Sequence, residues 1–578
     1  MSAGGTNTID AVQRLVQFDV AASHIAAGKQ EMRDRGMAIV LWTVSVAAGL
    51  CLFAAGLALG EANLDEGWYL YAARMVSRGR LPFVDFAFTQ GPVMPFAYSV
   101  AMPMVRAWGV LGGRIFTAVL GLGACLCAAL LAARLAGKEC RGTAAWISAT
   151  LVLVNACQAS FFTLVKTYSL ASIFVTGGFL AFACAAVSRK TWLAALGGIL
   201  LGAASCVRLS AAAVPLVVLA FVAWRALAAG RRDPGLGRVC LAAAISTAAA
   251  ILAGFLPFVL KSPEGLKFGL LEYHAGRSAG GLLPAIAYKA GFASRLVQDY
   301  FAAFCLAAVV ACHEVVRRSE KAACGGCAES SPCQDESRAI RVAGWLAVLG
   351  VTAVHIAAPF PYDDYQTFIY PLAAALLGAE AAIRMASVAG IAGTGDGVRR
   401  RAESAALTLV LLVCAGAAFS SPVTHSWFVG QRDRLWWPLR EESSLRRLRR
   451  AAEVVRGLCG PDRLVLTQDT YLAVEAGLDV PEGMEMGPFS YFPDWPREKA
   501  EKLHVLNREM MREVLRTSQA SVAALSGYGL AVRAPEIVEL SAEEQRALRG
   551  IIEERYRLAQ RIGRFGHAET TLEIYQRR

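Results

Sequence analysis

The sequence predicts a polytopic α-helical membrane protein that ends in a soluble domain of mixed helix and strand. Of its 578 residues, 56% are hydrophobic and 18% are charged, whereas a soluble chain carries about a quarter charged residues. The apolar residues gather in runs long enough to cross a bilayer, and each such run predicts a membrane-spanning helix. This composition excludes collagen, a disordered chain, a small disulfide-linked scaffold and a nucleic-acid enzyme.

The apolar runs set the expected number of spans. A hydrocarbon core of about 30 Å needs about 20 apolar residues in a helix, and this criterion predicts about 11 transmembrane helices. The first run is too long, and starts too far from Met1, to be a cleaved signal peptide. The predicted spans are 37–59, 112–133, 144–162, 170–187, 193–207, 211–229, 239–260, 297–312, 342–358, 368–383 and 405–420.

Basic residues in the connecting loops predict the orientation. Alternate loops carry Lys and Arg, and these loops all lie on the cytoplasmic side if the N-terminus is cytoplasmic. The segment after the first span also holds Arg74, Arg78 and Arg80, but its aromatic, amphipathic character favours helices on the outer surface. The net charge of +12 is therefore mainly an orientation signal, and membrane lipids, not nucleic acid, are the expected partners.

These features divide the chain into three parts. Residues 1–36 form a cytoplasmic segment, and 37–422 form the transmembrane domain with a long first outer loop at 60–109. Because the number of predicted spans is odd, residues 423–578 lie outside. In this last part, helical patterns at 443–458, 499–517 and 541–560 alternate with short strand-like runs at 463–467, 521–525 and 571–575, which predicts an α/β or α+β domain.

The first outer loop holds the most informative acidic residues. Asp65 and Glu66 follow the first span directly, beside Trp68 and Tyr69, and Asp85 lies further along the loop. On composition alone, an ordinary solvated loop and a catalytic site are equally compatible with these carboxylates.

The order of residues in this loop resembles a known family. Asp65-Glu66, the aromatics, Arg74, Gly79-Arg80, Asp85 and Gln90-Gly91-Pro92 are similar to the first external loop of GT-C glycosyltransferases. The nearest likeness is to the protein mannosyltransferase and aminoarabinose transferase group (glycosyltransferase family 39-like). It extends over roughly 37–421, with one span, a long acidic loop, a ladder of spans and an external C-terminal domain in the same order.

The resemblance implies an activity and a location. The expected reaction is an inverting transfer of a sugar from an undecaprenyl-phosphate donor to a lipid, glycan or protein acceptor. It would take place at the periplasmic face of a bacterial inner membrane. By the same resemblance, Asp65 is the general base that takes the proton of the acceptor hydroxyl. Glu66 orients the acceptor or supports the loop, and Asp85 binds acceptor or sugar.

A lipid-phosphate leaving group requires fixed positive charge near the headgroups. Arg208 lies between two apolar runs, where the related transferases often keep a Lys or Arg; the alternative is an arginine that snorkels to the headgroups. Lys166 lies on the same side. Some relatives place a metal-liganding acid in its loop, but this chain has no neighbouring carboxylate there. Phosphate or pyranose contact is therefore expected at Lys166, no metal ligand is predicted, and a need for a divalent cation stays open.

Two later outer loops add binding candidates. His274 and Arg277 are placed to reach the phosphate, and a basic loop facing the headgroups is an equally good interpretation. Tyr362 and Tyr365 precede a span that contains Pro371, in a loop that resembles the one closing over the donor in these transferases. The alternative for both tyrosines is an interfacial aromatic belt.

Two other functions are also compatible with the sequence. A transporter or flippase of a lipid-linked saccharide would also have many spans and an arginine at a span end, although the paired repeats of transporters are not found. A polysaccharide ligase or polymerase would use a lipid-linked oligosaccharide. Gly-rich phosphate loops are absent from the sequence, which argues against a nucleotide-sugar donor. The Cys324 and Cys327 pair lacks a second pair to complete a zinc site.

Overall fold

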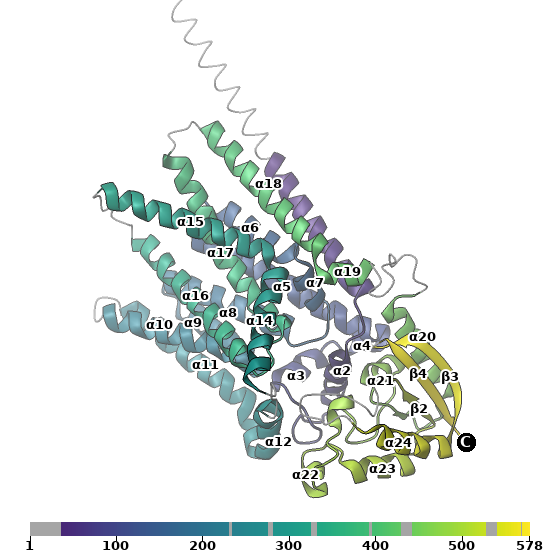
Figure 1. The fold of residues 1–578 in the computed structure, drawn as a ribbon. Helices are drawn as coiled ribbons and strands as arrows, with labels where there is room; N and C mark the ends of the chain where they lie inside the picture. The colour runs from purple at the N-terminus through teal and green to yellow at the C-terminus, as the bar shows by residue number, and fades with distance from the viewer. Residues whose placement is uncertain are drawn as a thin grey trace, which may run out of the picture.

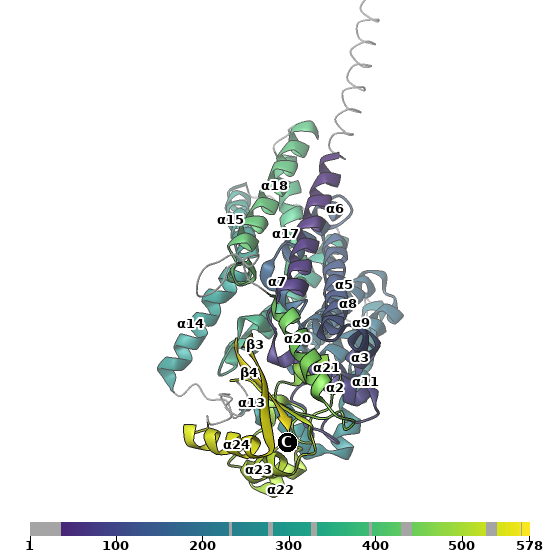
Figure 2. The ribbon, with the colours of Figure 1, turned by 90° about the vertical axis from the view of Figure 1, so that its right-hand side faces the viewer.

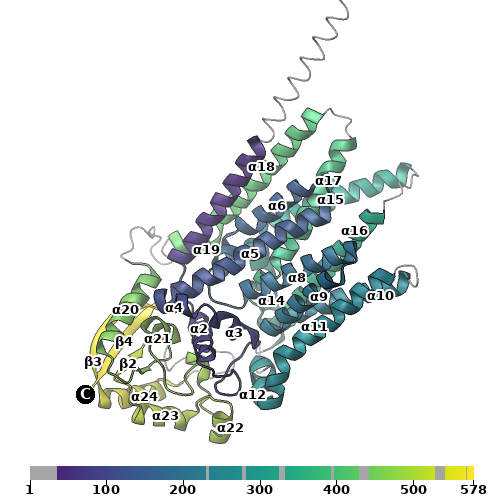
Figure 3. The ribbon, with the colours of Figure 1, turned by 180° about the vertical axis from the view of Figure 1, so that it is seen from behind.

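A bundle of long apolar helices is joined to a smaller part that contains a β-sheet (Figure 1). The structure is a computed structural model, and it describes residues 36–229, 234–275, 281–324, 332–391, 396–428, 442–527, 540–567 and 569–578. Figures 1 and 3 show the sheet-containing part at one end of the bundle, with α2 (Leu64–Ser77) and α3 (Val93–Ser99) between the two.

The bundle consists of helices from all along the first 420 residues. Its first helix is Gly36–Leu59. The others are α5 (Val110–Ala136), α6 (Arg141–Leu153), α7 (Ala156–Phe161), α8 (Tyr168–Ser188), α9 (Thr191–Val207), α10 (Ala213–Ala229), α11 (Pro234–Lys261), α14 (Leu282–Asp299), α15 (Phe301–Cys324), α16 (Pro332–Ala357), α17 (Tyr370–Ile391) and α18 (Asp396–Ser420). Figure 2 shows α14 on the outside of the bundle.

Several of these helices are long and apolar enough to cross a membrane. Six of the described helices meet that criterion, and α14 with α15, bent by 86°, would make a seventh span. The chain is therefore a membrane protein with several spans, whereas the total of about 11 stays a prediction. The predicted span 144–162 is broken into α6 and α7 because Asn155 ends one helix and caps the next, its side chain accepting from the Gln158 amide at 2.8 Å.

The first loop, 60–109, is folded against the bundle by α2. The helix begins with a capping box, in which Asn63 Oδ1 accepts from the Asp65 amide and Glu66 Oε2 accepts from the Asn63 amide. Trp68 and Tyr69 are buried. The aromatic side chains of α2 therefore pack into the interior of the protein and do not face lipid, whereas the location of this loop on the outer side of the membrane stays a prediction.

The part after residue 442 combines helices with a four-stranded sheet in the order β1-β2-β4-β3. β1 (Val465–Leu466) is parallel to β2 (Val522–Leu525), and β4 (Thr570–Arg577) is antiparallel to β2 and to β3 (Tyr556–Phe565). A helix was expected at 541–560, but α24 ends at Arg555 because the following residues pair with β4. The remaining helices are α20 (Ser444–Leu458), α21 (Thr470–Ala476), α22 (Arg497–Lys502) and α23 (Arg508–Thr517).

This C-terminal part docks directly on α2 and on the start of α5. A Cβ atom at Gly67 would lie 2.3 Å from the Tyr471 amide nitrogen, so only glycine allows α2 to approach α21 this closely. Tyr71 Oη accepts from the Val480 amide at 3.1 Å, and Glu475 Oε2 accepts from the Val110 amide at 2.7 Å. The two parts therefore meet through one close approach at Gly67 and through hydrogen bonds between a side chain of one part and a backbone amide of the other.

Candidate functional site

A cavity of about 760 Å³ lies where the first loop, the bundle and the C-terminal part meet. The beginning of α2 forms one wall, and the turns before α8 and after α9 form others. The segment between α16 and α17 lines it as well, and the C-terminal part adds Phe489 and His567. Such a junction of separate elements is a usual place for a small-molecule site.

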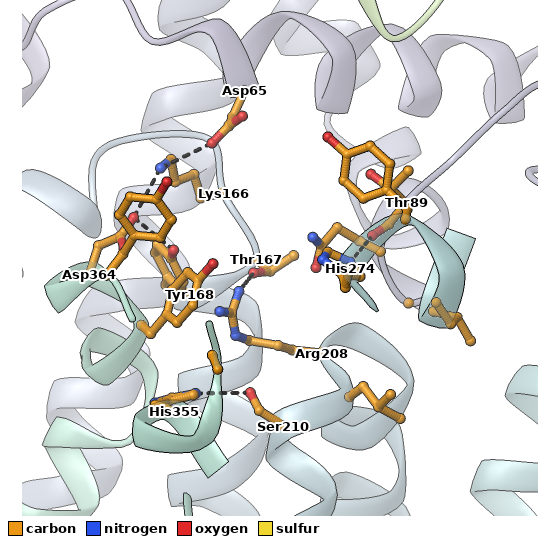
Figure 4. Close-up of a pocket in the computed structure, with 18 of the residues that line it drawn as sticks. Asp65, Thr89, Lys166, Thr167, Tyr168, Arg208, Ser210, His274, His355 and Asp364 are labelled. Atoms are coloured by element: carbon orange, nitrogen blue, oxygen red, sulfur yellow. Dashed lines mark hydrogen bonds and ion pairs between the residues drawn. The ribbon is translucent and has the colours of Figure 1, made fainter. Parts of the chain in front are cut away.

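An ion-paired cluster stands on one side of this cavity (Figure 4). Lys166 Nζ lies 3.0 Å from Asp65 Oδ2 and 3.1 Å from Asp364 Oδ2. Tyr168 Oη donates to the same Asp364 oxygen at 2.8 Å. One ammonium group therefore bridges two carboxylates that are 299 residues apart in sequence, since they carry the numbers 65 and 364.

The charge state of Asp65 follows from this cluster. Burial by itself raises the pKa of the Asp65 carboxyl, but the Lys166 ammonium and a hydrogen bond from Trp68 Nε1 at 3.2 Å outweigh it, so the pKa is lowered. The two carboxylates likewise raise the pKa of Lys166 against the effect of burial. Asp65 is thus an ionised carboxylate, and 30% of its side chain remains exposed.

Arg208 supplies a second positive charge, at the end of α9. Its Nη1 donates to Thr167 Oγ1 at 3.2 Å, and its guanidinium carbon lies 4.5 Å from the Tyr365 ring centre and 5.0 Å from that of Tyr168. Within the described part of the chain, no carboxylate forms an ion pair with it, and its buried Nε has no hydrogen-bond partner. An arginine held by aromatic rings and lacking an anionic partner is suited to bind an anion.

The remaining polar pairs extend around the cavity. His355 Nε2 and Ser210 Oγ lie 3.1 Å apart, and His274 Nε2 lies 3.0 Å from the Thr89 carbonyl oxygen. In Figure 4, the His274 pair lies across the cavity from the Asp65 cluster, with Arg208 between them.

Glu66 does not line the cavity. Its side chain is 1% exposed, and its Oε1 and Oε2 accept from Arg114 Nε and Nη2 at 2.7 and 2.5 Å. Oε1 also accepts from the Val165 amide at 3.2 Å. Arg114 further donates to the carbonyl oxygens of Gly60 and Glu61. Of the two roles expected for Glu66, this geometry favours support of the loop.

Replacing Glu66 by alanine should therefore lower the free energy of unfolding by about 3–5 kcal/mol, because it leaves the buried Arg114 charge without a carboxylate partner. Thermal unfolding of the purified protein in detergent measures this effect. Glu498→Ala, at an exposed position on α22, is the matched control and should leave the transition unchanged. An unaltered transition in Glu66→Ala would contradict the supporting role.

Asp85 also lies outside the cavity lining. Its Oδ2 accepts from the Leu81 amide at 2.7 Å, and Arg80 Nη2 donates to its carbonyl oxygen at 2.7 Å. These contacts stabilise the turn at 81–86, and the Asp85 carboxylate accepts its hydrogen bond from within this turn.

Three of the four binding candidates from the later loops line the cavity. His274, Tyr362 and Tyr365 line the cavity together with Asp65, Lys166 and Arg208. Tyr362 and Tyr365 pack edge to face, with their ring centres 5.5 Å apart. Arg277 lies outside the described residues, as does Cys327.

Asp364 is the main site residue that sequence reasoning missed. The sequence shows no carboxylate near Lys166, but the fold brings two to it. The available signal was the position of Asp364 between the two tyrosines of a loop already considered for binding. His567, in the C-terminal part, had no comparable signal.

Comparison with known proteins identifies the fold. No family model matches the chain, and no curated protein matches it in sequence. Two crystal structures of ArnT from Cupriavidus metallidurans, bound to undecaprenyl phosphate and in the apo state, match it with 13% and 14% identity and a TM-score of 0.56. The matches cover 92% of this chain and 98% and 97% of ArnT.

A second type of protein matches less closely. The Archaeoglobus fulgidus oligosaccharyltransferase in the apo form has 11% identity and a TM-score of 0.47, over 85% of this chain and 69% of that one. ArnT and this oligosaccharyltransferase are both GT-C membrane glycosyltransferases. The likeness to ArnT along nearly the whole chain confirms the predicted GT-C fold.

Proposed function

We propose that this GT-C chain is an inverting glycosyltransferase that moves a sugar from a polyprenyl-phosphate donor to an acceptor hydroxyl at the periplasmic face of a bacterial inner membrane. One observation carries the proposal: an ionised carboxylate, Asp65, and an arginine without a carboxylate partner among the described residues, Arg208, line the same cavity. The ArnT structure with undecaprenyl phosphate supports a lipid-phosphate donor.

Asp65 would act as the general base. As the acceptor oxygen forms its bond to the anomeric carbon, the bond from that carbon to the phosphate oxygen breaks, and the electron pair leaves with the polyprenyl phosphate. The acceptor proton passes to Asp65, which Lys166 keeps ionised and oriented. Attack from the face opposite the phosphate inverts the anomeric configuration.

Arg208 would bind the departing phosphate. Its guanidinium can donate in a fork to two phosphate oxygens, and the rings of Tyr168 and Tyr365 hold it in place. Lys166 uses two of its three N–H donors on Asp65 and Asp364, which leaves one for phosphate or pyranose. Tyr362 would pack against the sugar or the lipid at the exposed rim.

A divalent cation does not fit between Asp65 and Asp364, because the Lys166 ammonium already takes that position. Within the described ranges, no group of three or more His, Cys, Asp or Glu side chains could hold a metal. We therefore expect the rate of sugar transfer to be unchanged by EDTA. Assay of the purified enzyme before and after chelation checks this, and a loss of activity that Mg²⁺ or Mn²⁺ restores would contradict it.

The proposed function is tested with purified protein in proteoliposomes and radiolabelled undecaprenyl-phosphate hexose. Cleavage of the sugar–phosphate bond, with labelled hexose released or transferred, supports a glycosyltransferase. Movement of intact donor between leaflets without cleavage would instead show a flippase.

A further inference from the structure

The hairpin between β3 and β4 brings the C-terminal part to the cavity. His567 lies in its turn, two residues beyond Phe565 at the end of β3, and lines the same cavity as Asp65. The His567 side chain is exposed, so it lies where the cavity opens to solvent. After burial, Lys166 and Trp68, a positive charge on His567 also contributes to lowering the pKa of the Asp65 carboxyl.

Close packing holds this turn in place. Gly566 has a φ of +74°, and a Cβ atom there would lie 2.3 Å from Tyr471 Oη. The Tyr471 ring stacks on Phe565, with ring centres 5.8 Å apart, and its hydroxyl donates to Asp469 Oδ1 at 2.9 Å. The position of the turn is therefore fixed by its contacts with Tyr471 at the start of α21.

The start of α21 is in turn fixed against the helix that carries Asp65. The Tyr471 amide approaches Gly67 so closely that a Cβ atom would not fit, and Gly67 is two residues from Asp65. Two close contacts thus connect the turn at His567 with α2, the helix that carries Asp65. Neither contact involves a membrane-spanning helix.

The lining of the cavity indicates which substrate meets this turn. Around Arg208, the walls come from apolar bundle elements, including Leu216 of α10 and Val354 of α16, which suit a polyprenyl chain. Phe489 and His567 come instead from the part after residue 442, where no described helix is a candidate span. The polar, hydroxyl-bearing portion of the acceptor therefore belongs on the His567 side.

We infer that His567 is a positioning residue for the acceptor, holding it by hydrogen bonds so that its hydroxyl faces Asp65. The inference rests on the proposed function. It makes the C-terminal part a component of the active site. It also predicts that removing the imidazole weakens binding of the acceptor and leaves binding of the donor unchanged.

The test uses the full-length enzyme, radiolabelled undecaprenyl-phosphate hexose and a detergent extract of the native membrane as the acceptor pool. His567→Ala should raise the apparent KM for the extract about tenfold, the effect of losing one hydrogen bond, with the KM for the donor unchanged. His567→Gln keeps hydrogen-bonding capacity and should restore most of the affinity. Gly566→Ala, which displaces the turn from Tyr471, should resemble His567→Ala.

Gln560→Ala is the matched control, since Gln560 is exposed on β3 and does not line the cavity; it should behave as wild type. If His567→Ala keeps the wild-type KM for the extract, or alters the KM for the donor instead, the inference is wrong. Failure of the wild-type protein to cleave the donor would overturn the proposed function itself, a result distinct from either of these.

Discussion

Replacing Asp65 by asparagine should lower the rate of sugar transfer by about 10²–10⁴-fold, the contribution of a positioned general base. Asparagine keeps the size of the side chain but cannot accept the proton. Lys166 retains its second carboxylate, Asp364, so the variant should insert and fold. Initial rates with radiolabelled undecaprenyl-phosphate hexose measure the effect, and the KM for the donor should change little.

The matched control for this variant is Asp494→Asn, because Asp494 is an exposed aspartate of the C-terminal part that does not line the cavity. It should transfer sugar at the wild-type rate. Wild-type turnover by Asp65→Asn would remove Asp65 from the mechanism. The lowered pKa of Asp65 adds a pH expectation: because the base stays ionised below the usual carboxyl pKa of 3.8, its protonation should not limit transfer when the pH is lowered to that value.

Replacing Arg208 by glutamine should reduce transfer by about 10²–10³-fold, the usual cost of removing one donor that stabilises developing negative charge. Unlike Asp65→Asn, this variant should also bind undecaprenyl phosphate more weakly, because in the proposed mechanism the guanidinium would contact the phosphate before and after the reaction. Arg208→Lys should recover only part of the loss, since an ammonium group cannot donate in a fork. Kinetics and equilibrium binding of the lipid measure both effects.

Arg497→Gln serves as the control, because Arg497, on α22, forms exposed ion pairs and does not line the cavity. Wild-type affinity for undecaprenyl phosphate in Arg208→Gln would show that Arg208 does not bind the donor phosphate.

Much of the fold follows from local sequence. Long apolar runs predicted most of the bundle helices, and short β-branched or apolar runs marked β1, β2 and β4. Local sequence patterns gave the wrong secondary structure where hydrogen bonding between distant strands decides it. Residues after Arg555 look helical, but they form β3 because β4, which comes later in the chain, supplies the hydrogen bonds. Asn155 divided a predicted span because its side chain caps the following helix.

In the site, too, neighbouring residues could be predicted from the sequence, whereas their partners from distant segments could not. Asp65 and Glu66 are adjacent in sequence and therefore point about 100° apart on a helix. Asp65 reaches the cavity and Glu66 reaches Arg114. Which carboxylate faces the cavity depends on the positions of Lys166 and Arg114, which the local sequence does not give. Asp364 joins the cluster through long-range packing, which no local pattern encodes.

The place of β4 within the sheet has a consequence for biosynthesis. β4 lies between β2 and β3 and pairs with both, yet the ribosome makes it after every helix of the bundle. The sheet can therefore close only once the bundle helices have been synthesised, and the turn that carries His567 reaches Asp65 as one of the final events of maturation. A nascent chain arrested before residue 570 would lack β4, and therefore the paired hairpin that places His567 at the cavity.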